Sequence, residues 1–138
     1  MTDSDIARIA RETRTIAVVG LSPKEDRPSY GVARYLQSQG FRVIPVNPGH
    51  AGEKILGETT YADLASIPGD AGVDMVDIFR RSDAVEPIVD EALAVLPGLK
   101  TVWMQLGVTN EAAAEKARAK GVTVVQDHCP KIEFPRYL

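Results

Sequence analysis

The chain has 138 residues, 44% of them hydrophobic and 25% charged, with a formal net charge of −3. This length and composition predict one soluble globular domain that buries a core without needing a disulfide or a metal. The net negative charge argues against a nucleic-acid-binding surface, and the single cysteine, Cys129, excludes an intramolecular disulfide. The apolar runs are far shorter than the ~20 residues of a membrane span.

The N-terminal segment 1–13 predicts a short amphipathic helix rather than a targeting signal. Ile6 and Ile9 recur at helical spacing, and Asp3 or Ser4 is a suitable N-cap. The segment lacks the positive n-region and the apolar h-region of a signal peptide. Together with the lone cysteine, this predicts a cytoplasmic protein with no membrane partner.

Five short apolar segments alternate with helical patterns along the rest of the chain. Their hydrophobicity is almost continuous, which is typical of strands buried on both faces of a parallel sheet. Helical connections between parallel strands are right-handed crossovers, so helices are expected on both faces of the sheet. The pattern predicts a single Rossmann-like, doubly wound α/β domain over residues 1–138, with strand order 3-2-1-4-5. The predicted strands are residues 15–20, 41–46, 73–79, 101–105 and 122–126, and the helices are 30–39, 83–95 and 110–120, with a short helical stretch at 61–66.

The loop after the first strand has the composition of a phosphate-binding turn. Gly20 lets the backbone approach a phosphate, Ser22 and Ser29 supply hydroxyl donors, and Lys24 and Arg27 neutralise charge. The loop departs from the G-x-G-x-x-G pattern because it is longer and a serine occupies the second glycine position. We predict that it binds phosphate; the alternative is a plain βα turn with surface charges.

In a doubly wound sheet, a ligand binds outside the carboxyl ends of the strands, where the strand order reverses. An NAD-binding domain usually carries an acid after its second strand, but this chain has Asn47-Pro48-Gly49 there. The Asn47 amide can hydrogen-bond a ribose or a base without adding charge. A ligand with an extra phosphate on its ribose tolerates this neutral side chain better than an acid. After the third strand, Arg80 is predicted to bind a phosphate and Phe79 to cover an adenine face.

The last two strand ends offer an amide and a thiol. Gln105 suits a close approach of the ligand, and Cys129 could meet a thiol ligand, although a free cysteine is more often a small buried hydrophobe. The histidines His50 and His128 follow different strands without metal-ligand spacing, so no metal site is expected. No nucleophile elbow or P-loop is present, and no catalytic residues are predicted.

Several short motifs occur in order along the strand ends: Val18-Val19-Gly20-Leu21-Ser22, Arg27-Pro28-Ser29-Tyr30-Gly31-Val32, Val46-Asn47-Pro48, Asp77-Ile78-Phe79-Arg80-Arg81, Trp103-Met104-Gln105-Leu106-Gly107 and Asp127-His128-Cys129-Pro130. Together they resemble the small stand-alone CoA-binding proteins, which are similar to the N-terminal CoA-binding domain of the succinyl-CoA synthetase α subunit. The resemblance runs from about Thr15 to the C-terminus. It implies a Rossmann-like fold with coenzyme A across the strand ends. It also implies that the pyrophosphate and 3′-phosphate lie near Gly20, Ser22, Arg27 and Arg80, with the nucleotide near Asn47 and Pro48.

The resemblance does not extend to the ligase activity. A synthetase transfers phosphate through a histidine in a further domain, which has no counterpart in this chain. Cys129-Pro130 matches an Asn-Cys-Pro segment of the synthetase domain, with His128 in place of the asparagine. The expected function is therefore binding of coenzyme A or an acyl-CoA without catalysis. In one form of this function, the protein presents the bound ligand to a catalytic partner protein. The alternative is an NAD(P)-binding oxidoreductase or redox-sensing module.

Overall fold

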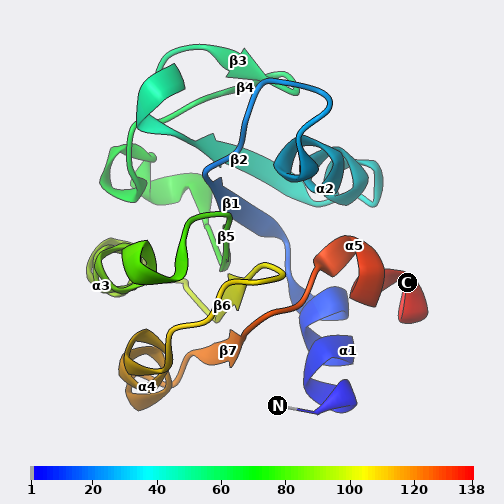
Figure 1. The fold of residues 1–138 in the computed structure, drawn as a ribbon, viewed down its shortest axis with the longest axis vertical. Coiled ribbons are helices and arrows are strands. Elements are labelled where there is room, and N and C mark those ends of the chain that lie inside the picture. Colours follow the sequence, from blue (N-terminus) through cyan, green and yellow to red (C-terminus); the bar gives the residue numbers. More distant parts are fainter. Residues whose placement is uncertain (1) are drawn as a thin grey trace.

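Five short strands pair in parallel to form the central sheet (Figure 1). The structure is a computed structural model that describes residues 2–138; Met1, which the predicted segment 1–13 includes, lies outside the described residues. Every residue of β1 and β5 is buried, as a strand covered on both faces requires. The predicted class, a doubly wound α/β sheet, is confirmed.

The elements follow one another as α1 (Asp3–Glu12), β1 (Thr15–Val19), α2 (Pro28–Ser38), β2 (Arg42–Val46), η1 (Pro48–His50), β3 (Lys54–Ile55), β4 (Glu58–Thr59), η2 (Leu64–Ser66), η3 (Gly69–Ala71), β5 (Met75–Ile78), η4 (Ser82–Ala84), α3 (Val85–Val95), β6 (Thr101–Met104), α4 (Glu111–Ala119), β7 (Thr123–Val125), α5 (Pro130–Glu133) and η5 (Phe134–Arg136). The η elements are single turns of 3-10 helix. Over residues 2–138, no helix has the length and apolarity of a membrane span.

The order of the strands differs from the prediction. The sheet runs β2-β1-β5-β6-β7, which is 2-1-3-4-5 in the numbering of the predicted strands, so the predicted order 3-2-1-4-5 is wrong. β5 pairs with the free side of β1, where Ile16 lies opposite Met75. The physical reason is Pro45 in β2: proline has no N–H for a sheet ladder and is confined to edge strands. Its carbonyl points outward, where it accepts a hydrogen bond from the Tyr61 N–H (3.0 Å).

Helices cover both faces of the sheet in two separate apolar layers (Figure 1). α1, α2 and α5 lie on one face, where the rings of Trp103 and Phe134 meet edge to face with centroids 5.5 Å apart. α3 and α4 lie on the other face, where Ala113, Ala114 and Ala117 let α4 approach the sheet closely. Because side chains fill both faces, the strand ends are left for a ligand.

The predicted N-terminal helix is present as α1, but its N-cap lies one residue before the earlier of the two predicted caps. Thr2, not Asp3 or Ser4, is the N-cap: its hydroxyl accepts from the Asp5 N–H (3.3 Å), and the Asp5 carboxylate accepts from the Thr2 N–H (3.0 Å). This reciprocal capping box satisfies two amides at once, which a cap further along the chain would not do.

Candidate functional site

The candidate site lies at the carboxyl ends of β1, β2 and β5. The chain leaves β1 towards α2 on one face of the sheet and leaves β5 towards α3 on the other. These opposite departures open a crevice at the strand ends, the usual ligand position in this architecture. Two cavities lie here, on either side of the end of β1.

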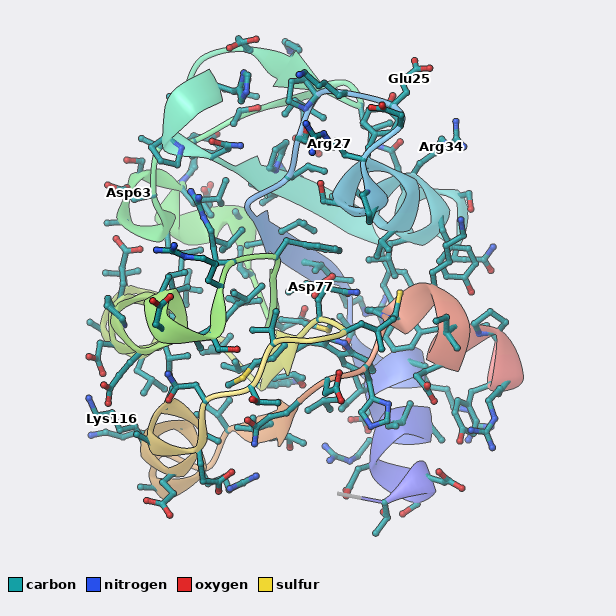
Figure 2. All side chains as sticks on the ribbon, in the orientation of Figure 1. Glu25, Arg27, Arg34, Asp63, Asp77 and Lys116 are labelled. Atoms are coloured by element: carbon teal, nitrogen blue, oxygen red, sulfur yellow. The ribbon has the colours of Figure 1, made fainter. Side chains whose placement is uncertain are left out.

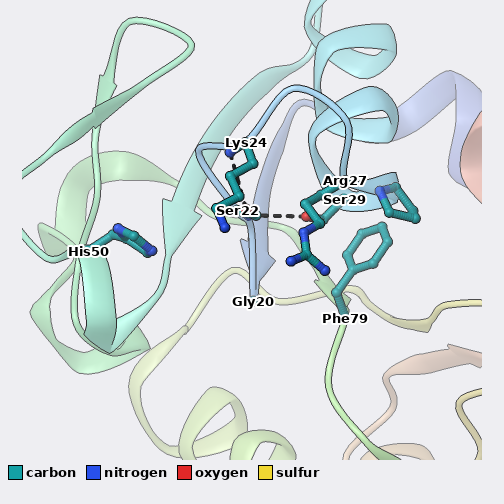
Figure 3. Close-up of a pocket in the computed structure, with 8 residues that line it drawn as sticks. Gly20, Ser22, Lys24, Arg27, Ser29, His50 and Phe79 are labelled. Carbon is teal, nitrogen blue, oxygen red and sulfur yellow. Dashed lines mark hydrogen bonds between the residues drawn. The ribbon is translucent and has the colours of Figure 1, made fainter.

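The first cavity has a volume of about 400 Å³ and is open to solvent (Figure 3). Six of its lining residues were given a role in the sequence analysis: Gly20, Ser22, Lys24, Arg27, Ser29 and Phe79. The remaining lining residues are Pro28 and His50. The volume lies within the range of small-molecule sites in proteins.

The backbone of the phosphate-type loop is held by its own serines. The Ser22 N–H donates to the Ser29 hydroxyl oxygen, and the Lys24 N–H donates to the Ser22 hydroxyl oxygen, both at 3.1 Å (Figure 3). Each hydroxyl therefore keeps its own hydrogen for a ligand. α2 begins at Pro28 with no side-chain N-cap, so the positive end of this helix also faces the loop. The loop is ordered before any anion arrives.

Gly20 is required by packing as well as by any ligand. Its φ is +90°, and a Cβ built on it would lie 2.6 Å from the carbonyl oxygen of Phe79. The neighbouring atom belongs to the backbone, so it cannot rotate away as a side chain would. A side chain at this position is excluded both by the backbone conformation and by the close approach of the two strand ends.

Basic side chains reach the first cavity from two sides. Lys24 and Arg27 come from the loop after β1, and His50 comes from η1 after β2, across the cavity (Figure 3). The His50 Nδ1 lies 2.9 Å from the Glu53 carboxylate. Neither Lys24 nor Arg27 takes part in an ion pair with any residue of the described chain. This arrangement suits a ligand with several negative charges.

The second cavity, of about 190 Å³, lies on the α3 side of the end of β1. Two predicted site residues, Pro48 and Arg80, line this cavity and not the first. Arg80 is half-buried, whereas the adjacent Arg81 is exposed and pairs with Asp83 (3.4 Å). The other lining residues are Val19, Val46, Ala62, Asp63, Leu64, Ile88 and Glu91.

Asn47 lines neither cavity but holds the neighbouring loops in place. Its amide nitrogen donates to the Leu21 carbonyl oxygen, and its amide oxygen accepts from the Gly49 N–H, both at 3.0 Å. It thus fastens the end of β2 to the loop after β1. Because both ends of the amide bind protein, the structure gives Asn47 a positioning role.

Gln105 and Cys129 line neither cavity. In the amide orientation that satisfies its neighbours, the Gln105 nitrogen donates to the carboxyl group of Asp77 (3.1 and 3.3 Å). Asp77 is fully buried in the middle of the sheet (Figure 2), and burial raises its pKa well above the usual value. Cys129 is buried in the apolar layer beside α2 and α5, near Trp103 and Phe134.

Two residues of the first cavity, Pro28 and His50, are outside the predicted set. Pro28 forms the first turn of α2, a position that proline favours, so its place beside the loop could be read from the sequence. His50 could not, because it reaches the cavity only through the turn of η1, four residues beyond the last residue of β2. Over residues 2–138, no group of three or more His, Cys, Asp or Glu side chains is placed to hold a metal ion.

Comparison with known proteins identifies relatives of the whole chain. An uncharacterized protein of Bacillus subtilis, YneT, is 36% identical over 129 residues, which cover 94% of this chain and 91% of that protein. The structure of cell-free ID.343 from Thermus thermophilus matches with a TM-score of 0.91 and 34% identity, and covers all of both chains. A dinucleotide-forming acetyl-coenzyme A synthetase of Ca. Korarchaeum cryptofilum shares the fold (TM-score 0.67, 24% identity); the match covers 89% of this chain and 27% of the synthetase.

The family comparison agrees with the fold and the motifs at the strand ends. The family model described as CoA binding domain matches residues 14–135, nearly the whole chain. The matched region includes every residue that lines the two cavities. The chain therefore belongs to the CoA binding domain family.

Proposed function

We propose that this protein binds coenzyme A or an acyl-CoA at the carboxyl edge of its sheet, with the phosphates in the first cavity. The observation that carries the proposal is the chemistry of that cavity. Lys24, Arg27 and His50 converge on it together with two serine hydroxyls, and none of its eight lining residues is acidic. Coenzyme A carries a pyrophosphate and a ribose phosphate, so it matches this excess of positive charge.

Each predicted site residue has a role in this proposal. Gly20 lets the ligand pass close to the backbone, Ser22 donates through its hydroxyl, and Lys24 and Arg27 neutralise phosphate. Phe79 supplies apolar surface beside the phosphates. Pro48 and Arg80 serve the second cavity, Asn47 positions the loops, and Gln105 and Cys129 support the strand ends over which the pantetheine arm passes. The proposal comprises binding alone; chemistry on the bound thioester would come from a partner protein.

The direct test is titration calorimetry of the purified protein with coenzyme A, dephospho-coenzyme A and NADPH. We expect coenzyme A to bind and dephospho-coenzyme A to bind about ten- to hundredfold more weakly, the effect of losing one charged hydrogen bond. NADPH should not compete. No binding of coenzyme A at millimolar concentration would refute the proposal.

A pair of arginines on α2 and its N-cap gives a matched control. Arg27→Ala removes a guanidinium that lines the first cavity, and we expect a loss of affinity of about tenfold or more. Arg34→Ala removes the same charge from an exposed position about two turns into α2, where Figure 2 shows the side chain pointing away from the molecule. Equal effects of the two substitutions would mean that only overall charge matters, and the first cavity would not be the site.

A further inference from the structure

The three strand ends divide their residues between the two cavities. At the end of β1, Val19 lines the second cavity and Gly20 the first; after β5, Arg80 lines the second and Phe79 the first. The turn after β2 does the same, with Pro48 in the second cavity and His50 in the first. The two cavities thus meet at the end of β1, and the ridge at Gly20 carries no side chain. One ligand laid across the ridge would therefore fill both cavities.

The two cavities differ in chemistry. The second is walled mainly by apolar side chains, including Ile88 and Leu64, and has two carboxylates at its edge, Asp63 and Glu91. The Glu91 Oε1 accepts from the Leu64 N–H (3.2 Å), and the Asp63 Oδ1 accepts from the Ser66 N–H (2.9 Å) and hydroxyl (2.6 Å). Each carboxylate thus has one oxygen bound within the protein and a second oxygen left as an acceptor.

We propose that the second cavity holds the adenine base of the ligand and that Glu91, with Asp63 beside it, accepts a hydrogen bond from the amino group of the base. This inference rests on the proposed function and extends it to the specificity of the site. A phosphate is disfavoured there, because it would face two carboxylates. The cavity is also smaller than a typical whole-ligand site, so it suits one flat moiety and not the long pantetheine arm.

Arg80 completes this base site. It is half-buried and lines the second cavity, although the sequence suggested that it binds a phosphate. A guanidinium plane is a surface on which nucleic-acid bases stack. In this assignment Arg80 packs on the base and balances the charge of the two carboxylates, and the phosphates are left to Lys24 and Arg27.

The test is a comparison of coenzyme A with its hypoxanthine analogue, in which a carbonyl oxygen replaces the amino group of adenine. By titration calorimetry, the wild-type protein should bind the analogue about ten- to hundredfold more weakly than coenzyme A. Glu91→Gln should reduce or reverse this preference, because the glutamine oxygen can keep the bond to Leu64 while its amide nitrogen donates to the carbonyl. Glu115→Gln, an exposed position on α4, is the matched control and should keep the wild-type preference.

Filling the cavity gives a second measurement that does not depend on charge. Ala62→Phe places a ring in the second cavity and should weaken coenzyme A binding about tenfold or more, whereas Ala65→Phe, exposed on η2 and not lining that cavity, should have no effect. Equal binding of coenzyme A and the analogue by the wild type, with no effect of Ala62→Phe, would overturn the inference and leave the proposed function standing. If the wild type binds neither compound, the proposed function itself is wrong.

Discussion

Replacing three glycines by alanine separates backbone strain from steric contact in this fold. Gly31 lies in α2 with ordinary helical φ, and its alanine Cβ would lie 3.8 Å from the Lys131 ammonium, an ordinary contact. Gly40 has a φ of +97° with open space around it, and Gly20 has a φ of +90° and the 2.6 Å approach to the Phe79 carbonyl oxygen. The series thus adds one unfavourable feature at a time.

The expected changes follow from these geometries. Gly31→Ala should raise the free energy of unfolding by about 0.5–1 kcal/mol, the helix propensity difference. Gly40→Ala should lower it by about 1–2 kcal/mol, because alanine is strained in the left-handed region. Gly20→Ala carries that strain plus an overlap with a backbone atom, so it should lower the free energy of unfolding by about 3 kcal/mol or more. For a domain of this length, that is a fall in Tm of about 10 °C.

Urea unfolding followed by circular dichroism, with Tm by calorimetry, measures all three variants. Gly20→Ala should also weaken coenzyme A binding, since relief of the overlap moves Phe79 at the wall of the first cavity, whereas Gly31→Ala should bind as the wild type does. If Gly20→Ala were no less stable than Gly40→Ala, the close approach of the two strand ends would not constrain this position, and the argument for Gly20 would be refuted.

Three further substitutions test other parts of the site. Because burial raises the pKa of Asp77, the folded protein binds more protons than the unfolded chain at pH values between the unfolded and folded pKa, and its stability falls as pH rises through that window. Asp77→Asn should flatten this pH dependence and be more stable than the wild type at pH 7.5. Urea unfolding with the same pH dependence for both proteins would contradict this prediction. Ser29→Ala removes the acceptor of the Ser22 N–H and should cost about 1 kcal/mol of unfolding free energy and weaken coenzyme A binding; unchanged affinity would show that the loop needs no such tie. Asp127 has a φ of +59° and accepts a hydrogen bond from the Gly107 N–H (2.7 Å). Asp127→Val should lower Tm by several degrees and Asp127→Asn by much less, because asparagine tolerates a positive φ and a β-branched residue does not. Equal Tm values for the two variants would exclude backbone strain at this position.

The sequence was sufficient for the fold class and for the location of the basic, serine-containing loop after β1. Continuous apolar segments exclude strands that face water, and helices between them leave only crossover connections. The serines and basic residues after Gly20 lie directly beyond a strand, so their place at the sheet edge follows from chain order. Short elements held by tertiary contacts, such as the β3–β4 hairpin and α5, left no comparable pattern and were not predicted.

The strand order depends partly on local sequence signals and partly on contacts between distant residues. Pro45 marks β2 as an edge strand, a signal present in the sequence that the predicted order 3-2-1-4-5 does not use. The sequence does not show in the same way which strand pairs with the other side of β1. That pairing joins Ile16 with Met75, residues far apart in the chain. No local pattern encodes that choice.

By itself, the sequence determined that this is a doubly wound α/β protein with a cationic loop after its first strand, because hydrophobic period and turn chemistry are local properties. Only the tertiary structure decided that the candidate site consists of two cavities, with Arg80 apart from Lys24 and Arg27. The physical reason is that successive side chains at a strand end point to opposite faces of the sheet. The cavity that each side chain reaches then depends on where the strand stops and on which helices cover the two faces.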